Sequence, residues 1–479
     1  MQPLTELGDP PALNMAPGPS PNPIDPWSVL PHFSHLIAHG NDEWIALATI
    51  LGLDVQVLSS GRFSEIDDAP AQRAAKVLNA LSYPMKDPFG DGCLDPAEAI
   101  ILLGDWRRVI DGNRGDGGER IAAASGMSWW KREEIRRFLW SPGAPLKMPF
   151  TTSAALKAAS KEGGALAIWP SRVSSGLMAE AESAEVKLVR VEDGFVRSVG
   201  LGSNLVPPLS VIVDRQGIHF DPSAPSDLEN ILARAEFSAP TLERAARLRA
   251  KIVEARISKY AAGEDDTHKS AASTPNTRAS KRVVLVPGQV EDDMSVLAGG
   301  GGLTSNLELL RRTRALEPDA EIWWRPHPDV DAGHRIGAVD DAAALKHADR
   351  IAREGAMSDL LDKVDALHTI TSLSGFEALL RGCDVTCHGV PFYAGWGLTR
   401  DLGEVPARRG RTLSLDELVA GVLILYPRYL DPVTKLPCPP ETLIKRLAEG
   451  EAVNRLGWVE PLRRAQGHLM RRLRKIGGS

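Results

Sequence analysis

The sequence predicts an α/β protein in which two doubly wound domains face a cleft, with a partial repeat near the N-terminus. Apolar runs of strand length alternate with helical patterns through most of the chain, and a small, polar segment at 261–280 interrupts this alternation. Residues 46–63 are similar to residues 377–392. Strand–helix alternation on both sides of a linker is typical of two doubly wound domains, whose ligands lie at the carboxyl ends of the strands.

Length and composition limit the class of protein. The chain has 479 residues, enough for two or three domains with separate cores. It is 43% apolar and 25% charged, and its 56 basic and 62 acidic residues give a net charge of −6. This balance argues against a chain-wide nucleic-acid surface. We therefore expect no nucleic-acid partner, and any anion must be held by a local site.

The N-terminal segment 1–39 is rich in Pro and is expected to be disordered. The first basic residue is Arg62, so the basic region of a secretory signal is missing, and no apolar run approaches the length of a membrane span. We expect a cytoplasmic protein. The cysteines are too few and too scattered for a disulfide framework, and only Cys383, Cys387 and His388 lie close together. We expect buried reduced thiols, no metal site and no cofactor.

The internal repeat has a second part, because residues 83–100 share Tyr-Pro, Asp-Pro, Cys and Glu with residues 426–444 in the same order. We interpret residues 40–115 as the tail of a first module that lacks its earlier strands. The complete module is expected to comprise domains at 120–260 and 281–450, joined by the linker 261–280. Helical patterns are expected at 226–260 and 340–354.

The first candidate loop is VEDGFVRS. The apolar run VKLVRV ends in Glu192 and Asp193, Gly194 follows at once, and Arg197 adds a positive charge. Asp-Gly is a common turn dipeptide, so a plain turn is the alternative. At the carboxyl end of a strand, however, the acid pair is expected to face the cleft.

Two loops of the second domain carry groups suited to a phosphate. VPGQVEDDMSVLAGGGGLTSNLELL contains Gln289 and a glycine run with Gly300 and Gly301 ahead of a predicted helix. Such backbone can present N–H groups to a phosphate, although a flexible loop is the alternative. In WWRPHPDV, His327 and Pro328 follow a strand. A His at this place can donate to a phosphate, or it can be a hydrogen-bonded structural residue.

The loop DALHTITSLSGFEALLRGCDV brings Thr371, Ser372 and Ser374 to the start of a helix, with Glu377 one turn in. Ser and Thr at a helix start are most often simple caps. The same helix start also offers its N–H groups and its dipole to a phosphate, and Glu377 could bind a ribose diol.

An acid pair before Gly, a His-Pro and a Ser/Thr cluster together resemble GT-B glycosyltransferases that use CMP-activated ulosonic acids, including bacterial sialyltransferases. Longer strings narrow the resemblance to the capsular polysaccharide biosynthesis and export proteins of the KpsC/LipA type: GMSWWKREEIRRFL, RVEDGFVRSVGLGS, PPLSVIVDRQGIHFDPSAPSDLENIL, VPGQVEDD, RPHPDV, TSLSGFEALLRG and PFYAGWGLT. The resemblance covers about residues 40–450. That family comprises β-Kdo transferases that build an oligo-Kdo linker on a lipid anchor. It usually carries two complete modules, so we expect at most one active site here.

The resemblance implies a GT-B-like fold, a CMP-Kdo donor, a lipid-linked glycan acceptor and retention of anomeric configuration. Retention through a covalent intermediate would make Asp193 the nucleophile, with Glu192 tuning or holding it. If the reaction inverted instead, Asp193 would be the general base. A sialyltransferase-like enzyme and a non-catalytic scaffold of a capsule assembly complex are the other two interpretations.

The remaining roles are also implied by the resemblance. The departing phosphate would meet His327, Ser372, Ser374 and the glycine loop without a metal. Arg197, Lys131 and Arg132 are candidates to bind the Kdo carboxylate, since a cationic side chain matches it. Solvated surface bases are the alternative for Lys131 and Arg132.

The C-terminal tail 451–479 carries six basic residues within a short stretch, interleaved with apolar ones: Arg463, Arg464, Arg471, Arg472, Arg474 and Lys475. A basic amphipathic helix of this kind predicts binding to the inner-membrane surface, and a solvated or packed tail is the alternative. Capsule export proteins are further candidate partners.

Overall fold

The computed structural model describes residues 13–14, 26–81, 85–115, 118–143, 145–196, 198–199, 206–257, 260–261 and 281–451. It divides into two compact units, Met1–Leu103 and Gly104–Ser479, which we describe separately. The predicted linker 261–280, apart from residue 261, lies outside the described residues, as does the C-terminal tail from residue 452 onward. No helix in the described part of the chain combines the length and the apolar composition that a membrane crossing requires.

The first unit contains a parallel three-stranded sheet in the order β1-β2-β3 and a separate hairpin of β4 and β5. Its elements are β1 (Leu13–Asn14), α1 (Pro26–Val29), η2 (Leu30–His32), β2 (His35–Ala38), α2 (Glu43–Ile50), β3 (Asp54–Val57), α3 (Pro70–Leu81), β4 (Met85–Lys86), β5 (Cys93–Leu94) and the start of α4 (Pro96–Arg114). The prediction that all of 1–39 is disordered is wrong for 26–38. Leu30, Leu36 and Ala38 are buried there, and burial of apolar side chains offsets the entropy of ordering the chain.

The repeat is visible in the local structure. Helix α2 and helix α15 (Leu373–Leu380) each end in a glycine with positive φ, Gly52 at 75° and Gly382 at 77°, before a parallel strand starts. Glycine adopts this left-handed conformation without the steric cost that other residues bear. The strand β2 shows that the repeat begins before residue 40, which corrects the predicted boundary.

The second unit begins with a six-stranded sheet in the order β19-β18-β10-β8-β7-β6. Its strands are β6 (Ile121–Ser125), β7 (Ala165–Ile168), β8 (Leu188–Asp193), β10 (Ser210–Asp214), β18 (Pro427–Leu430) and β19 (Pro437–Cys438). Strands β6, β7 and β8 are parallel, whereas β10, β18 and β19 pair antiparallel. The expected doubly wound parallel sheet is therefore only half correct for this domain, because a purely parallel sheet would need a crossover before β10.

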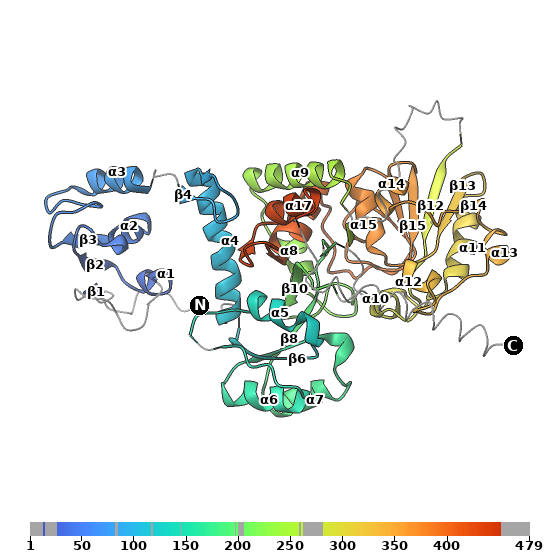
Figure 1. Ribbon diagram of the computed structural model, residues 1–479, viewed down its shortest axis with the longest axis horizontal. Coiled ribbons are helices and arrows are strands. Elements are labelled where there is room, and N and C mark those ends of the chain that lie inside the picture. Colours follow the sequence, from blue (N-terminus) through green and yellow to red (C-terminus); the bar gives the residue numbers. More distant parts are fainter. Residues whose placement is uncertain are drawn as a thin grey trace. The chain divides into compact units, whose positions relative to one another are not determined.

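Helices cover both faces of this sheet. Helices α6 (Thr152–Lys161) and α7 (Leu177–Ser183) lie together on one face, and α5 (Arg132–Phe138) lies on the other (Figure 1). Leu166 and Ile168 pack with α6 and α7, whereas Val189 and Val191 share a core with α5. The helical pattern at 226–260 forms two helices, α8 (Asp227–Arg234) and α9 (Ala239–Glu254), because Ser238 caps a new helix with Pro240 in its first turn.

The second sheet is entirely parallel, in the order β14-β13-β12-β15-β16-β17. Its strands are β12 (Val283–Pro287), β13 (Glu321–Arg325), β14 (Arg350–Ile351), β15 (Ala366–Thr369), β16 (Asp384–Cys387) and β17 (Arg400–Asp401). The direction in which strands are added reverses between β12 and β15, and ligands of such sheets bind at this switch point. The described helices beside it are α10 (Met294–Gly299), α11 (Asn306–Leu316), α12 (Pro328–Asp331), α13 (Asp341–Ala344), α14 (Met357–Leu361) and α15.

The predicted helix at 340–354 is wrong. Only α13 is helical there, and β14 extends the sheet beside β13, since Ala352 N–H donates to the Trp324 carbonyl at 2.7 Å. The cysteine prediction also needs a correction: all four cysteines are free, and three are buried, but Cys93 is exposed.

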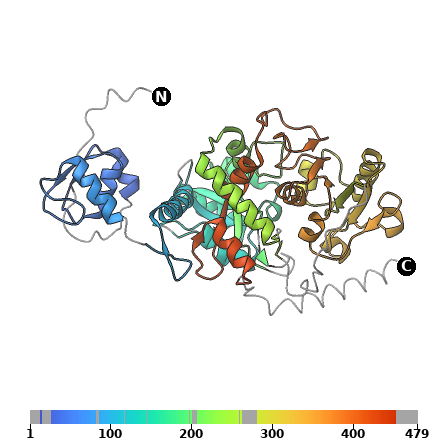
Figure 2. The same ribbon diagram turned by 90° about the horizontal axis from the view of Figure 1, so that it is seen from above.

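The chain returns to the first sheet at its end, so the predicted domain 281–450 is too long. The domain built on the first sheet also contains the elements that follow residue 414. They are α16 (Leu415–Val419), the π-helix η7 (Ala420–Leu425), β18, β19 and α17 (Pro440–Ala448). Both views place α17 beside α9 (Figures 1 and 2), and the Arg244 guanidinium donates to both Glu441 carboxylate oxygens at 2.7 and 2.9 Å. Antiparallel pairing of β18 with β10 fixes the return.

Candidate active site

Three side chains meet at the carboxyl ends of the three parallel strands of the first sheet. Lys131 follows β6, Trp169 follows β7 and Asp193 ends β8. The Lys131 Nζ donates to Asp193 Oδ1 at 3.0 Å and lies 3.5 Å from the centroid of the Trp169 ring. Lys131 is only 7% exposed and Trp169 only 5%. A buried ammonium needs a carboxylate or an aromatic face to replace its hydration, and Lys131 has both.

The acid pair is held by the end of β8. Glu192 and Asp193 pair with Ile212 and Val211 of β10, and both acids are half-buried. The Asp193 N–H donates to Glu192 Oε1 at 3.1 Å. Gly194 is required by its neighbour, because a Cβ there would lie 2.1 Å from the Ser210 hydroxyl oxygen. The predicted strand end with a carboxylate pair is confirmed.

The basic residues predicted to bind the sugar carboxylate have different surroundings. Lys131 reaches Asp193, but the Arg132 guanidinium donates to the backbone carbonyls of Met148 and Pro149 and lies 5.3 Å from the centroid of the Phe150 ring. Burial, and then the nearby charge of Arg136, lower the pKa of Arg132. Arg197 lies outside the described residues. Of the two that are described, Lys131 is the one that the structure joins to the acid pair.

The switch point of the second sheet holds a neutral hydrogen-bond network centred on Gln289. The Gln289 Oε1 accepts from the Thr371 N–H at 2.9 Å, and its Nε2 donates to the Thr371 hydroxyl at 3.0 Å. The Thr369 hydroxyl donates to the same Oε1 at 3.2 Å. All three residues are buried, so this network joins the ends of β12 and β15 through satisfied polar groups.

The Ser/Thr cluster does start a helix, as predicted. Ser372 caps α15, because its Oγ accepts from the Ser374 N–H at 3.2 Å, and the Tyr393 hydroxyl donates to its carbonyl. Glu377 is buried one turn into the same helix. The expected position of the cluster, at the carboxyl end of β15, is therefore confirmed.

His327 lies at the carboxyl end of β13 and caps the short helix α12, in which Pro328 is the first residue. Its Nδ1 accepts from the Asp329 N–H at 3.1 Å. In a neutral imidazole this hydrogen bond places the proton on Nε2.

The glycine run differs from its prediction. Instead of preceding a helix directly, it ends the short helix α10: the Gly300 N–H donates to the Val296 carbonyl at 2.9 Å, and Gly301 and Gly302 follow with positive φ. The next helix, α11, begins only after its own cap, Ser305. The Gly300 N–H is thus engaged within its own helix.

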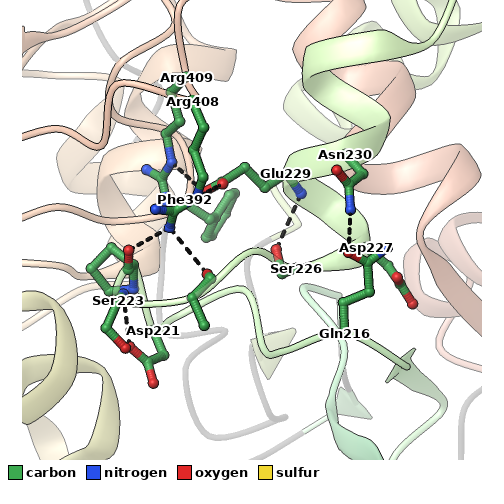
Figure 3. A network of polar contacts seen from close by, with 12 residues as sticks. Gln216, Asp221, Ser223, Ser226, Asp227, Glu229, Asn230, Phe392, Arg408 and Arg409 are labelled. Carbon is green, nitrogen blue, oxygen red and sulfur yellow. Dashed lines mark hydrogen bonds and ion pairs between the residues drawn. The ribbon is translucent and has the colours of Figure 1, made fainter.

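Contacts also join the two parts of the second unit that carry these groups. Arg408 and Arg409 both donate to the Glu229 carboxylate of α8 (Figure 3), and the Arg409 bond measures 2.8 Å. Phe195, two residues after Asp193, packs against Phe392 with ring centroids 4.6 Å apart. These buried contacts hold the acid pair and the switch point in one compact unit.

Sequence reasoning missed Trp169, Tyr393 and the Glu229–Arg409 pair. An aromatic residue directly after a buried strand, as in ALAIWP, was the available signal for Trp169. Within the described ranges, no group of three or more His, Cys, Asp or Glu side chains is arranged to hold a metal ion.

Comparison with known proteins identifies the class of this chain. Residues 164–429 match the family described as "Capsule polysaccharide biosynthesis protein", and the chain belongs to this family. More particularly, it is a capsule protein of the KpsC/LipA type. It is 44% identical over 345 residues to the "Capsule polysaccharide modification protein LipA" of Neisseria meningitidis serogroup A, covering 72% of this chain and 47% of that protein. It is 45% identical over 251 residues to the "Lipopolysaccharide-processing protein LpsZ" of Rhizobium meliloti, covering 52% and 56%.

Two solved structures are similar as well. One is Thermosulfurimonas dismutans KpsC, "beta Kdo 2,7 transferase", with 34% identity, a TM-score of 0.55, and coverage of 69% of this chain and 99% of that chain. The other is the "beta Kdo 2,4 transferase" of the same organism, with 31% identity, a TM-score of 0.57, and coverage of 68% and 98%. The chain spans about half the length of the curated relatives it matches.

Proposed function

We propose that this chain is a retaining β-Kdo glycosyltransferase that transfers Kdo from CMP-Kdo to a lipid-linked acceptor in capsule biosynthesis. The observation that carries the proposal is the ion pair of Lys131 with Asp193 at the carboxyl end of β8, in a chain that covers nearly all of two Kdo transferase structures. We assign the two domains of the second unit to a GT-B-like arrangement with the donor at the β12/β15 switch point.

The reaction proceeds by two displacements. An Asp193 carboxylate oxygen attacks the anomeric carbon, the bond from that carbon to the phosphate oxygen breaks, and CMP leaves with the electron pair. The acceptor hydroxyl then attacks the same carbon and displaces Asp193. Its proton is released to solvent, and Glu192, whose Oε1 accepts from the Asp193 N–H, holds Asp193 in place. Two inversions give net retention.

Donors at the second sheet receive the departing phosphate. His327, with the proton of its neutral ring on Nε2, and the hydroxyls of Ser372 and Ser374 supply these hydrogen bonds, and we propose that no metal is needed. Glu377 binds the ribose diol, and Gln289 holds Thr371 in place. Because Gly300 and Gly301 end α10 and do not directly precede α11, we assign them no main hydrogen bond to the phosphate. They form a turn beside it.

We place the protein at the cytoplasmic face of the inner membrane, where a lipid-linked acceptor and capsule export proteins are accessible. A sialyltransferase-like activity would keep the switch point and change the sugar. A non-catalytic scaffold would need neither the buried Lys131–Asp193 pair nor the Gln289 network, and both are intact.

Purified protein incubated with CMP-Kdo and a synthetic Kdo-primed acceptor tests this function. We expect a β-linked product, with the linkage position read by NMR, since the 2,4 and 2,7 transferases are similarly related to this chain. CMP-sialic acid serves as the matched donor. Transfer from CMP-sialic acid alone would identify the alternative enzyme, and no transfer from either donor would favour the scaffold.

A further inference from the structure

Trp169 follows the strand that lies between the two strands leading to Lys131 and Asp193. Strand β7 lies between β6 and β8. Lys131 ends the 3-10 helix η3 (Trp129–Lys131), which follows β6, and Asp193 is the last residue of β8. Trp169 directly follows β7, and the centroid of its ring lies 3.5 Å from the Lys131 Nζ.

Trp169 is itself fixed. Its backbone N–H donates to the Ser125 carbonyl of β6 at 3.2 Å. Gly126, with φ of 82°, leaves room for it, since a Cβ there would lie 3.2 Å from the Trp169 Cβ. A rigid aromatic face thus supports a flexible, buried ammonium, which also lies 5.0 Å from the centroid of the Trp130 ring.

We propose that Trp169 is a positioning residue that holds Lys131 in one place while the anionic partner of Lys131 changes during the reaction. This inference rests on the proposed function. In the resting enzyme Lys131 pairs with the Asp193 carboxylate. When an Asp193 oxygen bonds to the anomeric carbon, the carboxylate becomes an uncharged ester and CMP carries away the electron pair of the broken bond.

The buried charge of Lys131 would then lose the Asp193 carboxylate, and the loss of an opposite charge at a buried site is costly. An ulosonic acid carries its own carboxylate on the anomeric carbon, one bond from the new ester linkage. Lys131, already within hydrogen-bond distance of Asp193, pairs with this carboxylate and returns to Asp193 when the acceptor hydroxyl displaces it. No proton moves in the first step, so the exchange conserves charge. The ligand class is therefore a sugar with an anomeric carboxylate.

The test compares CMP-Kdo with its carboxylate methyl ester as donors, using Trp169→Leu, Trp169→Phe and Lys131→Met. We expect the native protein to prefer the free carboxylate strongly. Trp169→Leu should lose about 10- to 100-fold in kcat and most of this preference, whereas Trp169→Phe, which keeps an aromatic face, should retain both in large part. Trp140→Leu is the matched control, because Trp140 is an exposed tryptophan that follows helix α5. This variant should behave as the native protein.

A double variant separates positioning from a loss of folding. If Trp169 acts through Lys131, Lys131→Met/Trp169→Leu should be no slower than Lys131→Met alone, and the thermal midpoints report folding separately. Additive losses, or an unchanged donor preference in Trp169→Leu, would overturn the inference. Absence of transfer by the native protein would instead overturn the proposed function.

Discussion

The carboxyl ends of β6, β7 and β8 hold a charged pair, whereas the carboxyl ends of β12 and β15 hold neutral amide and hydroxyl groups. Lys131 and Asp193 form an ion pair against an aromatic ring. Gln289, Thr369 and Thr371 form a network of amide and hydroxyl groups without formal charge. A nucleophile must be ionised to react, so a fixed cation beside it is useful. A site for a nucleotide phosphate needs oriented donors, which neutral groups supply at a helix start.

The sharpest test of this comparison is Asp193→Asn. We expect transfer to fall by a factor on the order of 10³ or more, because an amide cannot act as the nucleophile. CMP binding, which belongs to the second sheet, should change little by calorimetry. Asp319→Asn, at an exposed position, is the control. An active Asp193→Asn enzyme would contradict the assignment, and intact mass of a slowed variant with donor alone should show attached Kdo.

The next largest effect concerns the link between the two regions. Glu229→Gln leaves two guanidinium groups without their carboxylate, and the side chain of Arg409 is only 3% exposed. Removing one partner of a buried ion pair costs about 3–5 kcal/mol, so the free energy of unfolding should fall by this amount. Urea unfolding measures it, with exposed Glu236→Gln as the control. Equal stability of the two variants would show that this contact does not hold the regions together.

Gln289→Ala should damage the neutral region alone. It leaves the Thr371 N–H and the hydroxyls of Thr369 and Thr371 without this partner, at a cost of about 1–3 kcal/mol in unfolding free energy. CMP affinity should fall about tenfold, which corresponds to 1.4 kcal/mol. Formation of the Asp193 adduct at saturating donor should persist. Loss of the adduct at saturation would mean that the two regions are not separable.

His327→Ala should weaken donor binding and turnover, each by about 10-fold, because it removes a donor to the departing phosphate. Neither a chelator nor added divalent metal should change the native rate. If a chelator abolished activity and magnesium or manganese restored it, a metal site at Asp292 and Asp293 would be the better interpretation. In the structure Asp292 pairs with Arg335 at 2.9 Å, and Asp293 caps α10.

The smallest effect on either region is expected from deleting residues 461–479, which lie outside the described residues. Each basic residue near an anionic leaflet contributes about 1 kcal/mol, so the deletion should abolish salt-sensitive co-sedimentation with anionic vesicles. Activity on a soluble acceptor should be retained. Vesicle binding that is unchanged, or that does not respond to salt, would exclude the electrostatic anchor.

Local patterns in the sequence determined a large part of this protein. Alternating apolar runs predicted the strands, Asp193 and Gly194 marked the end of β8, and Ser372 marked the start of α15. The similarity of residues 46–63 and 377–392 predicted a repeat whose glycines share one backbone conformation. These features depend on neighbours along the chain, so periodicity and turn chemistry reveal them.

Only the tertiary structure decided which of these residues meet. The sequence pattern treated Lys131 and Arg132 alike, yet Lys131 reaches Asp193, whereas Arg132 donates to the backbone carbonyls of residues 148 and 149. Trp169 could not be placed beside Lys131 until the strand order put β7 between β6 and β8. The return of residues 415–448 to the first sheet, and the pairing of Glu229 with Arg409, join segments about 180 or more positions apart. Strand order and side-chain direction arise from packing of distant segments, which no local pattern encodes.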